Sequence, residues 1–328
     1  MRKLICLSIA SASLLVVGLF ATPVLGGEYW QEKWWPSKWG AEDEKGSFNT
    51  LTPQKIMSAL KVAKSGKTYR LGRPYEMSMP KFGSRTFSLH IPGLPVGGPV
   101  GDNNLVWNDE FIVGELGQVG TQFDGPGHVG IRGEDGVDRW YNGRALGSAD
   151  NTYGLKENGV EKVGPCITRG VLIDVAGLKG VEAMEKGEVI TPADIEACIV
   201  KAGIDPIGEG DAVIFHTGWG KNYSDSDLYN AGSPGIGIEA AKYLAEKNVS
   251  LLAADTWPVD AVPGENPTGA FDVHNFMQTV NGIWYLENLD NEPMAQMAKD
   301  GVYEFLFIFV PVPFAGATGS PGDAIAIH

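Results

Sequence analysis

The densest group of side chains able to do chemistry lies in one glycine-rich segment, residues 117–129. Within it, Gln118, Gln122, Asp124 and His128 are separated by four, two and four positions. The glycines and the proline of this segment argue against a helix, and even spacing on a strand that runs into a loop places side chains on one side. An aspartate and a histidine that meet there can bind a cation or carry a proton. A glycine-rich turn with an aspartate bonded to its own backbone would give the same pattern.

The elements that must position this segment are mostly short apolar strands. An apolar run, residues 111–116, leads directly into it. We expect strands at 68–71, 86–91, 105–116, 170–175, 211–217, 249–254 and 303–312, and helices at 52–66, 191–201 and 237–247, with a further helix starting at 274. Strands and helices follow one another irregularly, which favours an α+β, β-rich fold over a doubly wound sheet. No internal repeat or low-complexity linker divides the chain, so we expect one domain.

Composition excludes several classes of protein. The chain has 328 residues and a net charge of −14, which argues against a nucleic-acid partner and against an anionic membrane surface. Its 3 cysteines are too few for a disulfide-dense scaffold or for a zinc site made of four cysteines. Cys166 and Cys198 could pair in an exported protein, but two separate buried thiols are the expectation. With only 5 histidines, few residues are available for metal or proton chemistry.

The N-terminus predicts export. Residues 1–26 combine a basic start, an apolar run and a small-residue cleavage region, as in a secretory signal peptide. A single membrane anchor is the alternative, but the apolar run is short and no basic cluster follows it. We therefore expect a periplasmic or secreted protein with a functional domain at 27–328 and no membrane contact once the signal is removed. That domain begins with an aromatic arm, residues 28–39, which could pack on the core or on a partner subunit, or line a pocket.

The glycine-rich segment resembles a known motif. Gln118-x-Gly-Thr-Gln-x-Asp-x-Pro-x-His128 is similar to HxGTHxDxPxH, the metal-binding motif of the metal-dependent cyclase superfamily, which includes bacterial kynurenine formamidase, isatin hydrolase and a trans-dienelactone hydrolase. Further segments that look like this family are 39–53, 135–142, 170–174 and 216–219, together with His274 and Glu287. The resemblance therefore extends over most of the predicted mature chain.

The resemblance implies a site and a fold. Asp124, His274 and Glu287 match the family's metal ligands, and His128 matches its general base. Gln118 and Gln122 stand where the motif has two metal-binding histidines, so a tight two-zinc site is not expected. Because an amide oxygen is a harder ligand than imidazole, we expect one divalent metal, Zn²⁺ or Mn²⁺, with either glutamine completing its shell. The family also implies a swivelling β/β/α fold and a homo-oligomer, dimer or tetramer.

The expected reaction follows from this site. A metal-activated water would hydrolyse an amide, a lactone or another cyclic ester of a small-molecule substrate, with His128 or Glu287 carrying the proton. An arylformamidase acting on N-formylkynurenine is an alternative within the family, and the two glutamines weigh against it. A non-catalytic protein that keeps the fold and binds a metal or a ligand is the alternative from another class.

Several other residues could shape the pocket. Phe123, Trp219 and Trp257 are candidate substrate walls, although core packing would explain them equally well. Asp255 and Asp260 flank a turn after the predicted strand 249–254, where they could shape the site or accept hydrogen bonds from turn amides.

Overall fold

The computed structural model describes residues 33–328 of the chain. The predicted signal peptide, 1–26, and the start of the aromatic arm, Tyr29 and Trp30, lie outside the described residues. Within the described range, no helix is both long and apolar enough to cross a membrane.

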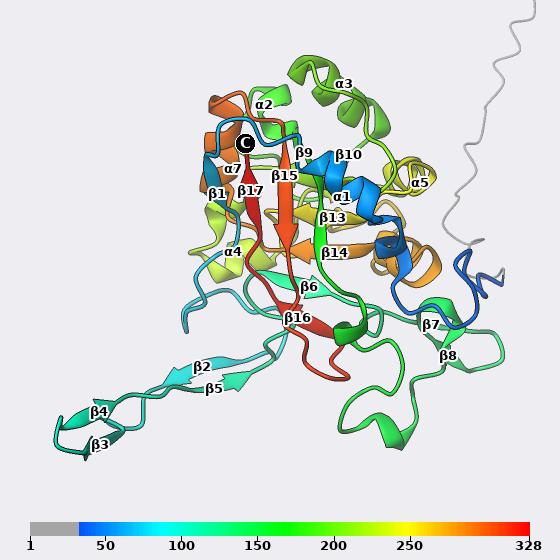
Figure 1. Ribbon diagram of the computed structural model, residues 1–328. Helices are drawn as coiled ribbons and strands as arrows, with labels where there is room; N and C mark the ends of the chain where they lie inside the picture. The colour runs from blue at the N-terminus through cyan, green and yellow to red at the C-terminus, as the bar shows by residue number, and fades with distance from the viewer. Residues whose placement is uncertain (1–32) are drawn as a thin grey trace, which may run out of the picture.

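A nine-stranded sheet forms the centre of the molecule (Figure 1). Its order is β1-β17-β15-β9-β11-β13-β14-β6-β16. The strands of this sheet are β1 Thr68–Arg70, β6 Gln122–Asp124, β9 Cys166–Asp174, β11 Ala212–His216, β13 Leu251–Ala254, β14 Trp284–Glu287, β15 Glu304–Phe309, β16 Gly319–Pro321 and β17 Ile325–Ile327. The middle strands β9, β11, β13 and β14 are parallel, and the flanking strands pair antiparallel. The predicted mixed α+β architecture is confirmed, and the parallel centre is a feature that the irregular sequence pattern did not predict.

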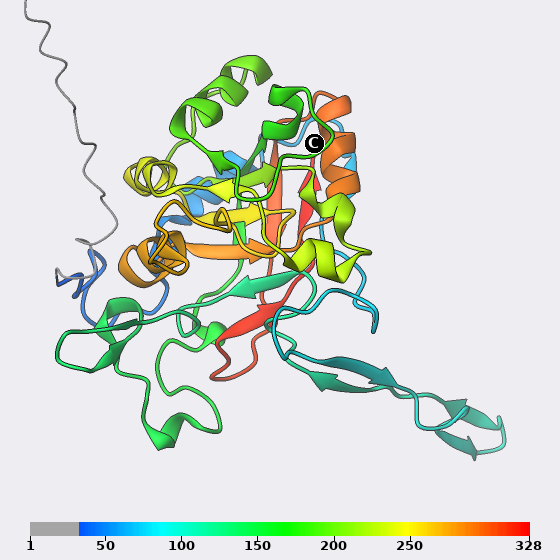
Figure 2. The ribbon, with the colours of Figure 1, turned by 180° about the vertical axis from the view of Figure 1, so that it is seen from behind.

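Four two-stranded sheets surround this centre. They pair β2 Phe87–His90 with β5 Phe111–Gly114, β3 Gly97–Val100 with β4 Leu105–Trp107, β7 Ile131–Arg132 with β8 Asp138–Arg139, and β10 Val189–Ile190 with β12 Gly235–Ile236. The single strand predicted at 105–116 is wrong: β4 and β5 are separate strands, because the polar residues 108–110 interrupt the apolar run. Together β2 to β5 form a narrow ribbon that projects from the body (Figure 2).

Helices pack on the sheet and connect its parallel strands. The α-helices are α1 Pro53–Ala59, α2 Val175–Lys179, α3 Pro192–Ala202, α4 Ser226–Asn230, α5 Ile238–Glu246, α6 Asp272–His274 and α7 Asn291–Lys299. The shorter turns are the 3-10 helices η1 Gly46–Thr50, η2 Tyr141–Gly143, η3 Ala149–Asn151, η4 Val160–Lys162 and η5 Trp219–Asn222, and the π-helix η6 Asn275–Val280. The helices predicted at 191–201 and 237–247 are confirmed. The helix that Thr52 caps ends near Leu60 and not at Gly66.

Two apolar cores lie on opposite faces of the central sheet. Along β9, Leu172 belongs to one core, whereas its neighbours Val171 and Ile173 belong to the other. This follows from the alternation of side chains along a strand. The core of Val171 is covered by α3 and α5, and the core of Leu172 by α7 and η1. Cys166 and Cys198 are both buried and free, as expected.

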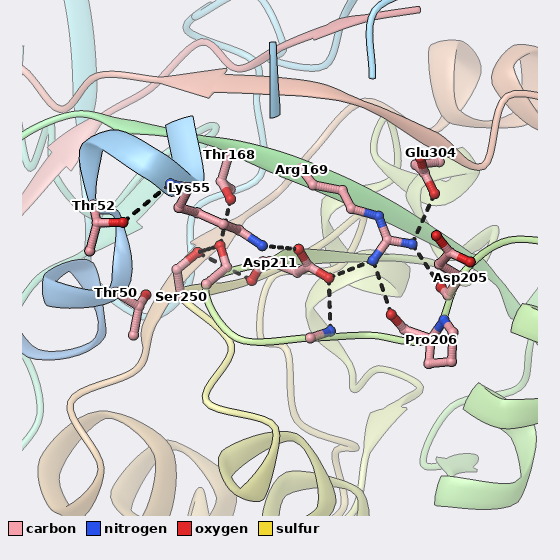
Figure 3. Close-up of polar contacts among 12 residues, drawn as sticks. Thr50, Thr52, Lys55, Thr168, Arg169, Asp205, Pro206, Asp211, Ser250 and Glu304 are labelled. Carbon is pink, nitrogen blue, oxygen red and sulfur yellow. Dashed lines mark hydrogen bonds and ion pairs between the residues drawn. The ribbon is translucent and has the colours of Figure 1, made fainter. Parts of the chain in front are cut away.

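A buried carboxylate ties α1 to the sheet (Figure 3). Asp211, at the start of β11, is 1% exposed and accepts from Lys55 Nζ and from Arg169 Nη1, each at 2.6 Å. Arg169 also reaches Glu304 at 2.9 Å. Because a buried charge must be paired, this network fixes how the helix, β9 and β15 meet.

Candidate metal centre and pocket

The side chains of strand β6, within the glycine-rich segment, point to two opposite faces. Gln122 and Asp124 point to one side, and Phe123 between them points to the other. Phe123 is fully buried and packs against Phe48 and Phe309, so it belongs to the core and does not line the pocket, contrary to one of the predicted roles. The neighbouring strand β14 runs antiparallel, and its Glu287 lies opposite Gln122.

His274 completes a cluster with two of these carboxylates. Its Nε2 atom lies 3.3 Å from Oε1 of Glu287 and 3.8 Å from Oδ2 of Asp124. It ends α6 where the chain continues into the π-helix η6, and π-helical turns are frequent at functional sites. The three predicted ligands are therefore brought together, with their ligand atoms within 4.8 Å of one another and all three residues buried.

The surroundings of this cluster fit a divalent cation. Nδ1 of His274 lies 2.7 Å from Oδ1 of Asp260, so a hydrogen bond from Nδ1–H to this carboxylate holds the ring with Nε2 facing Asp124 and Glu287, where the Nε2 lone pair would be available to a bound cation. Oε1 of Glu287 accepts from the backbone N–H of Val259 at 3.0 Å, which fixes that side chain. One imidazole nitrogen and two carboxylates are a usual ligand set for Zn²⁺ or Mn²⁺.

Electrostatics also favour a cation here. Burial and the charge of Asp124 raise the pKa of Glu287, although His274 opposes this. Burial alone would lower the pKa of His274, but Asp260 and Glu287 outweigh it and raise that pKa well above its usual value. Both shifts show crowded negative charge in a buried place, which a bound divalent cation would balance.

The two glutamines differ in what their amides do. Gln118 donates from Nε2 to Oδ1 of Asp124 at 3.0 Å and accepts at Oε1 from Nη2 of Arg85 at 3.4 Å. Because a carboxylate only accepts and a guanidinium only donates, this arrangement fixes which way the Gln118 amide points. Gln122 donates from Nε2 to Oε2 of Glu287 at 3.2 Å. Among the described residues, its carbonyl oxygen has no hydrogen-bond donor, so it is the freer of the two for a cation.

His128 lies in the loop after β6 and faces the same cluster. Its Nε2 atom is 3.6 Å from Oδ2 of Asp124, and 22% of its side chain is exposed. Burial is the main cause that lowers the pKa of His128, and the positive charges of His274 and Arg85 add to it against the opposing effect of Asp124. A neutral imidazole at the pocket wall can accept a proton near neutral pH.

A cavity of about 300 Å³ opens over the cluster. It is lined by Pro80, Phe82, Arg85, Gln118, Gln122, Asp124, His128, Val129, Gly130, Asn230, Trp257, Pro258, Ala270, Phe271, His274, Asn275, Glu287 and Asn288. Trp257 lines this cavity, where the sequence analysis expects a substrate wall. Trp219 is not among the lining residues; it packs in a small core with Met79 and donates from Nε1 to the carbonyl of Tyr229 at 3.2 Å.

The two aspartates after the predicted strand 249–254 have different roles. Asp255 accepts from the backbone N–H groups of Thr217 and Gly220, as predicted for a turn aspartate, whereas Asp260 holds His274 and so shapes the site, which is the other predicted role.

One residue beside the cluster is not identified from the sequence. Gln278 of η6 lies 3.5 Å from Oδ2 of Asp124, and its Oε1 is buried without a partner. No pattern in the sequence marks Gln278, which lies in an apolar turn.

The aromatic arm lines a cavity other than the one over the metal cluster. Trp34 and Trp39 line a separate cavity of about 150 Å³ beside Tyr141 and Ile283. The guanidinium of Arg139 lies 5.0 Å from the ring centre of Trp35. Within the described part of the arm, Trp34 and Trp39 thus line a pocket, one of the alternatives predicted for the arm.

Comparisons with known proteins agree with the fold. Residues 69–261 match the family model "Cyclase", described as "Putative cyclase". A crystal structure described as a novel cyclase has 27% identity and a TM-score of 0.76, with 89% of this chain and 96% of that chain covered. Isatin hydrolase A from Ralstonia solanacearum has 22% identity and a TM-score of 0.58, with 80% and 92% covered. An isatin hydrolase bound to thioisatinate has 20% identity and a TM-score of 0.56, with 84% and 98% covered. No curated protein sequence matches the chain. The predicted cyclase-like fold is confirmed.

Proposed function

Since the chain belongs to the cyclase family, we propose that it is a divalent-metal-dependent hydrolase that opens small cyclic esters or amides. The cluster of Asp124, His274 and Glu287 at the floor of the 300 Å³ cavity carries this proposal. The likeness of the fold to isatin hydrolases supports hydrolysis of a ring-shaped substrate. The freer carbonyl of Gln122 makes it our candidate for a fourth ligand, and this oxygen-rich set favours Mn²⁺ alongside Zn²⁺.

The residues around the cluster would have distinct roles in the proposed reaction. A bound divalent cation would supply positive charge that polarises a carbonyl group and acidifies water. Asp124, His274 and Glu287 would hold it, and Asp260 keeps the Nε2 lone pair of His274 directed at it. His128 would accept the proton of the attacking water at Nε2 and return it to the leaving oxygen or nitrogen. Phe82, Trp257 and Phe271 would limit the access of bulk water.

Metal analysis and a substrate panel test this proposal together. The purified protein should contain one divalent metal, lose its activity on lactones and cyclic amides after chelation, and regain it with Mn²⁺ or Zn²⁺. The variant Asp124→Asn should lose the metal, whereas Asp138→Asn, on an exposed hairpin, should keep it. Full activity after complete removal of the metal would disprove the proposal. Bound metal with no turnover on any substrate would favour a binding protein.

We also propose that the protein is exported. The support for this is the sequence of residues 1–26 alone. Expression with the complete N-terminus, followed by mass analysis of the product outside the cytoplasm, should give a chain that begins close to residue 27. An intact N-terminus retained in the cytoplasm would contradict export.

A further inference from the structure

Arg85 differs from the other arginines that the structure describes. Residues 33–328 contain seven arginines, and six of them form an ion pair with a carboxylate. The six are Arg70, Arg73, Arg132, Arg139, Arg144 and Arg169. No carboxylate of the described residues lies within 4.0 Å of the guanidinium of Arg85. Even Glu115, whose charge is near, directs its carboxylate to the backbone N–H of Thr86 at 2.5 Å.

The hydrogen bonds of Arg85 leave most of its donors free. Nη1 donates to the carbonyl of Phe82 at 3.2 Å, and Nη2 donates to Gln118 at 3.4 Å. Both acceptors are neutral and both contacts are long, whereas a guanidinium carries five N–H donors and pairs best with a carboxylate through two parallel bonds. The side chain is half-buried, so these donors are only partly served by water.

The unpaired charge faces the cavity over the metal cluster. Among the residues that line this cavity, Arg85 alone is a lysine or an arginine. A cation held by Asp124 and Glu287 would balance those two carboxylates, and Arg85 would then remain as a positive charge without a carboxylate partner among the described residues of the pocket. In a chain with a net charge of −14, an anionic substrate needs such a local positive group to enter.

The aromatic wall of the cavity suits a flat ring, and it adjoins Arg85, whose guanidinium lies 5.7 Å from the ring centre of Phe82. Phe82 and Trp257 stack with ring centres 4.4 Å apart and planes 13° apart, and Phe271 stands edge-on to Trp257 at 5.9 Å. Aromatic walls contact a planar ligand over a large area. The volume of about 300 Å³ limits that ligand to a small molecule.

We propose that Arg85 binds a carboxylate of the substrate, and that the substrates are small, flat cyclic esters or amides carrying a carboxylate. This inference rests on the proposed hydrolase function for the reaction, but the carboxylate site itself does not. Arg85 is then the residue that separates anionic substrates from neutral ones of the same shape.

Binding of benzoate and benzamide tests the carboxylate site without turnover. We expect the purified protein to bind benzoate more tightly than benzamide in calorimetric titrations. Arg85→Gln should weaken benzoate binding by about 10- to 100-fold, the loss expected for one charge-assisted pair, and leave benzamide unchanged. Arg85→Lys should fall between the two. The control Arg132→Gln, on the exposed hairpin β7–β8, should bind both as the unaltered protein does. Equal binding of the two probes, or benzoate binding unchanged in Arg85→Gln, would overturn the proposal.

A pair of lactones distinguishes the two proposals. With one neutral lactone and the same ring bearing a carboxymethyl group, Arg85→Gln should lower kcat/KM for the charged lactone at least 10-fold more than for the neutral one, and the difference should come from a higher KM for the charged lactone. Any effect through Gln118 or His128 lowers kcat/KM for both lactones alike. Hydrolysis of both lactones without any dependence on Arg85 would overturn the carboxylate site and leave the hydrolase function standing. Benzoate binding that depends on Arg85, with no hydrolysis, would do the opposite.

A second inference concerns the projecting ribbon, residues 86–114 (Figures 1 and 2). Eleven large apolar side chains on it are between 37% and 79% exposed. They are Leu89, Ile91, Leu94, Val96, Val100, Leu105, Val106, Trp107, Phe111, Ile112 and Val113. Adjacent residues of β5 are exposed, so both faces of the ribbon are apolar and uncovered. A two-stranded ribbon of this kind is marginally stable alone.

The area and the charge of the ribbon favour a second copy of this chain as its cover. The eleven side chains expose on the order of 1,000 Å² together, more than the few hundred Å² usual for an apolar patch on a monomer and close to one partner's share of a standard interface. The ribbon carries Asp102, Asp109 and Glu110 and no lysine or arginine, which disfavours an anionic membrane as its partner. A self-complementary contact around a two-fold axis would cover both ribbons at once.

We propose that the ribbon is the dimerisation element of the protein. In sedimentation experiments at micromolar concentration, the protein should be a dimer, and the double variant Val106→Glu with Val113→Glu should be a monomer. The matched control, Val181→Glu with Val200→Glu, changes two exposed valines on the body and should remain a dimer. A monomeric unaltered protein, a dimeric ribbon variant, or binding of the ribbon to neutral phosphatidylcholine vesicles in place of a second copy would overturn this proposal.

Discussion

Nδ1 of His274 and Oδ1 of Asp260 lie 2.7 Å apart, and this contact determines which ring nitrogen faces Asp124 and Glu287. Asp260 also accepts from the backbone N–H of His274 at 3.2 Å, so one carboxylate fixes both the ring and the start of its helical turn. His274, a candidate metal ligand, is thus oriented by Asp260, which is outside the group of three candidate ligands. This orienting role can be tested by metal binding, separately from catalysis.

We expect Asp260→Asn to weaken metal binding by about 10- to 100-fold, because an oriented and more basic imidazole is lost. Competition with a coloured chelator measures this affinity directly. The control Asp135→Asn removes an exposed carboxylate of the β7–β8 hairpin and should leave the affinity unchanged. Unaltered metal affinity in Asp260→Asn would show that the contact only supports the fold.

The buried network at Asp211 should matter for stability and not for the metal (Figure 3). Removal of this carboxylate in Asp211→Ala leaves Lys55 and Arg169 without their buried partner, so we expect the free energy of unfolding to fall by about 3–5 kcal/mol. Urea denaturation measures the change. In the control Asp138→Ala, which breaks an exposed pair with Arg132, stability should barely change. A small loss in Asp211→Ala would mean that water replaces the carboxylate.

A pH-dependent contribution to stability should come from His216 and Asp174, whose side chains meet at 2.7 Å between adjacent parallel strands. Burial alone would lower the pKa of His216, but the hydrogen bond to Asp174 and the charges of Asp255 and Asp174 outweigh it and raise that pKa. Burial would likewise raise the pKa of Asp174, but the hydrogen bond and the charge of His216 lower it.

The directions of the pKa shifts of His216 and Asp174 define the pH range over which this pair stabilises the folded protein. A histidine with a raised pKa contributes stability that is fully present below its unfolded value, about 6.5, and is lost as pH rises through the folded value. An aspartate with a lowered pKa contributes above its unfolded value, about 3.9, and loses this as pH falls. Urea unfolding from pH 5 to pH 9 should therefore show a decline in stability of the chelated protein that is smaller in His216→Gln, because the raised pKa of His274 contributes equally to both proteins. An identical decline in both proteins would assign it to other groups.

How far the sequence predicts this site depends on whether a residue follows a local pattern. The even spacing of Gln122 and Asp124 on a strand placed them on one face, and the same alternation should have placed Phe123 in the core. The meeting of Asp124 with Glu287 depends on the register of two strands far apart in the chain, which only the family resemblance supplied.

Other residues are not marked by any local pattern in the sequence. Arg85 is a single charge between a loop and a strand, and its lack of an ion pair becomes visible only when the partners of the other arginines are known. For the ribbon, the sequence predicts strands at 86–91 and 105–116, and their apolar residues are typical of buried strands but are exposed in the structure. The sequence does not predict the parallel centre of the sheet, because the segments that connect its parallel strands vary in length.

The last prediction concerns Phe271, whose backbone adopts the left-handed conformation at φ 54° and ψ 48°. A bulky residue is strained there, and such strain is retained mainly where a site requires the side chain. Its ring lines the cavity and stands edge-on to His274 at 5.4 Å. We therefore expect the position to favour glycine for stability and phenylalanine for function.

Two variants of Phe271 separate the strain from the ring. Phe271→Ala and Phe271→Gly both remove the ring, and only glycine relieves the backbone, so the glycine variant should be more stable than the alanine variant by about 1 kcal/mol. Both should lower kcat/KM for a flat substrate to the same extent, because the wall beside Trp257 is missing in each. Thermal unfolding and steady-state kinetics measure the two effects. A glycine variant less stable than the alanine variant would show that no backbone strain is present, and unchanged kinetics in both would remove Phe271 from the substrate wall.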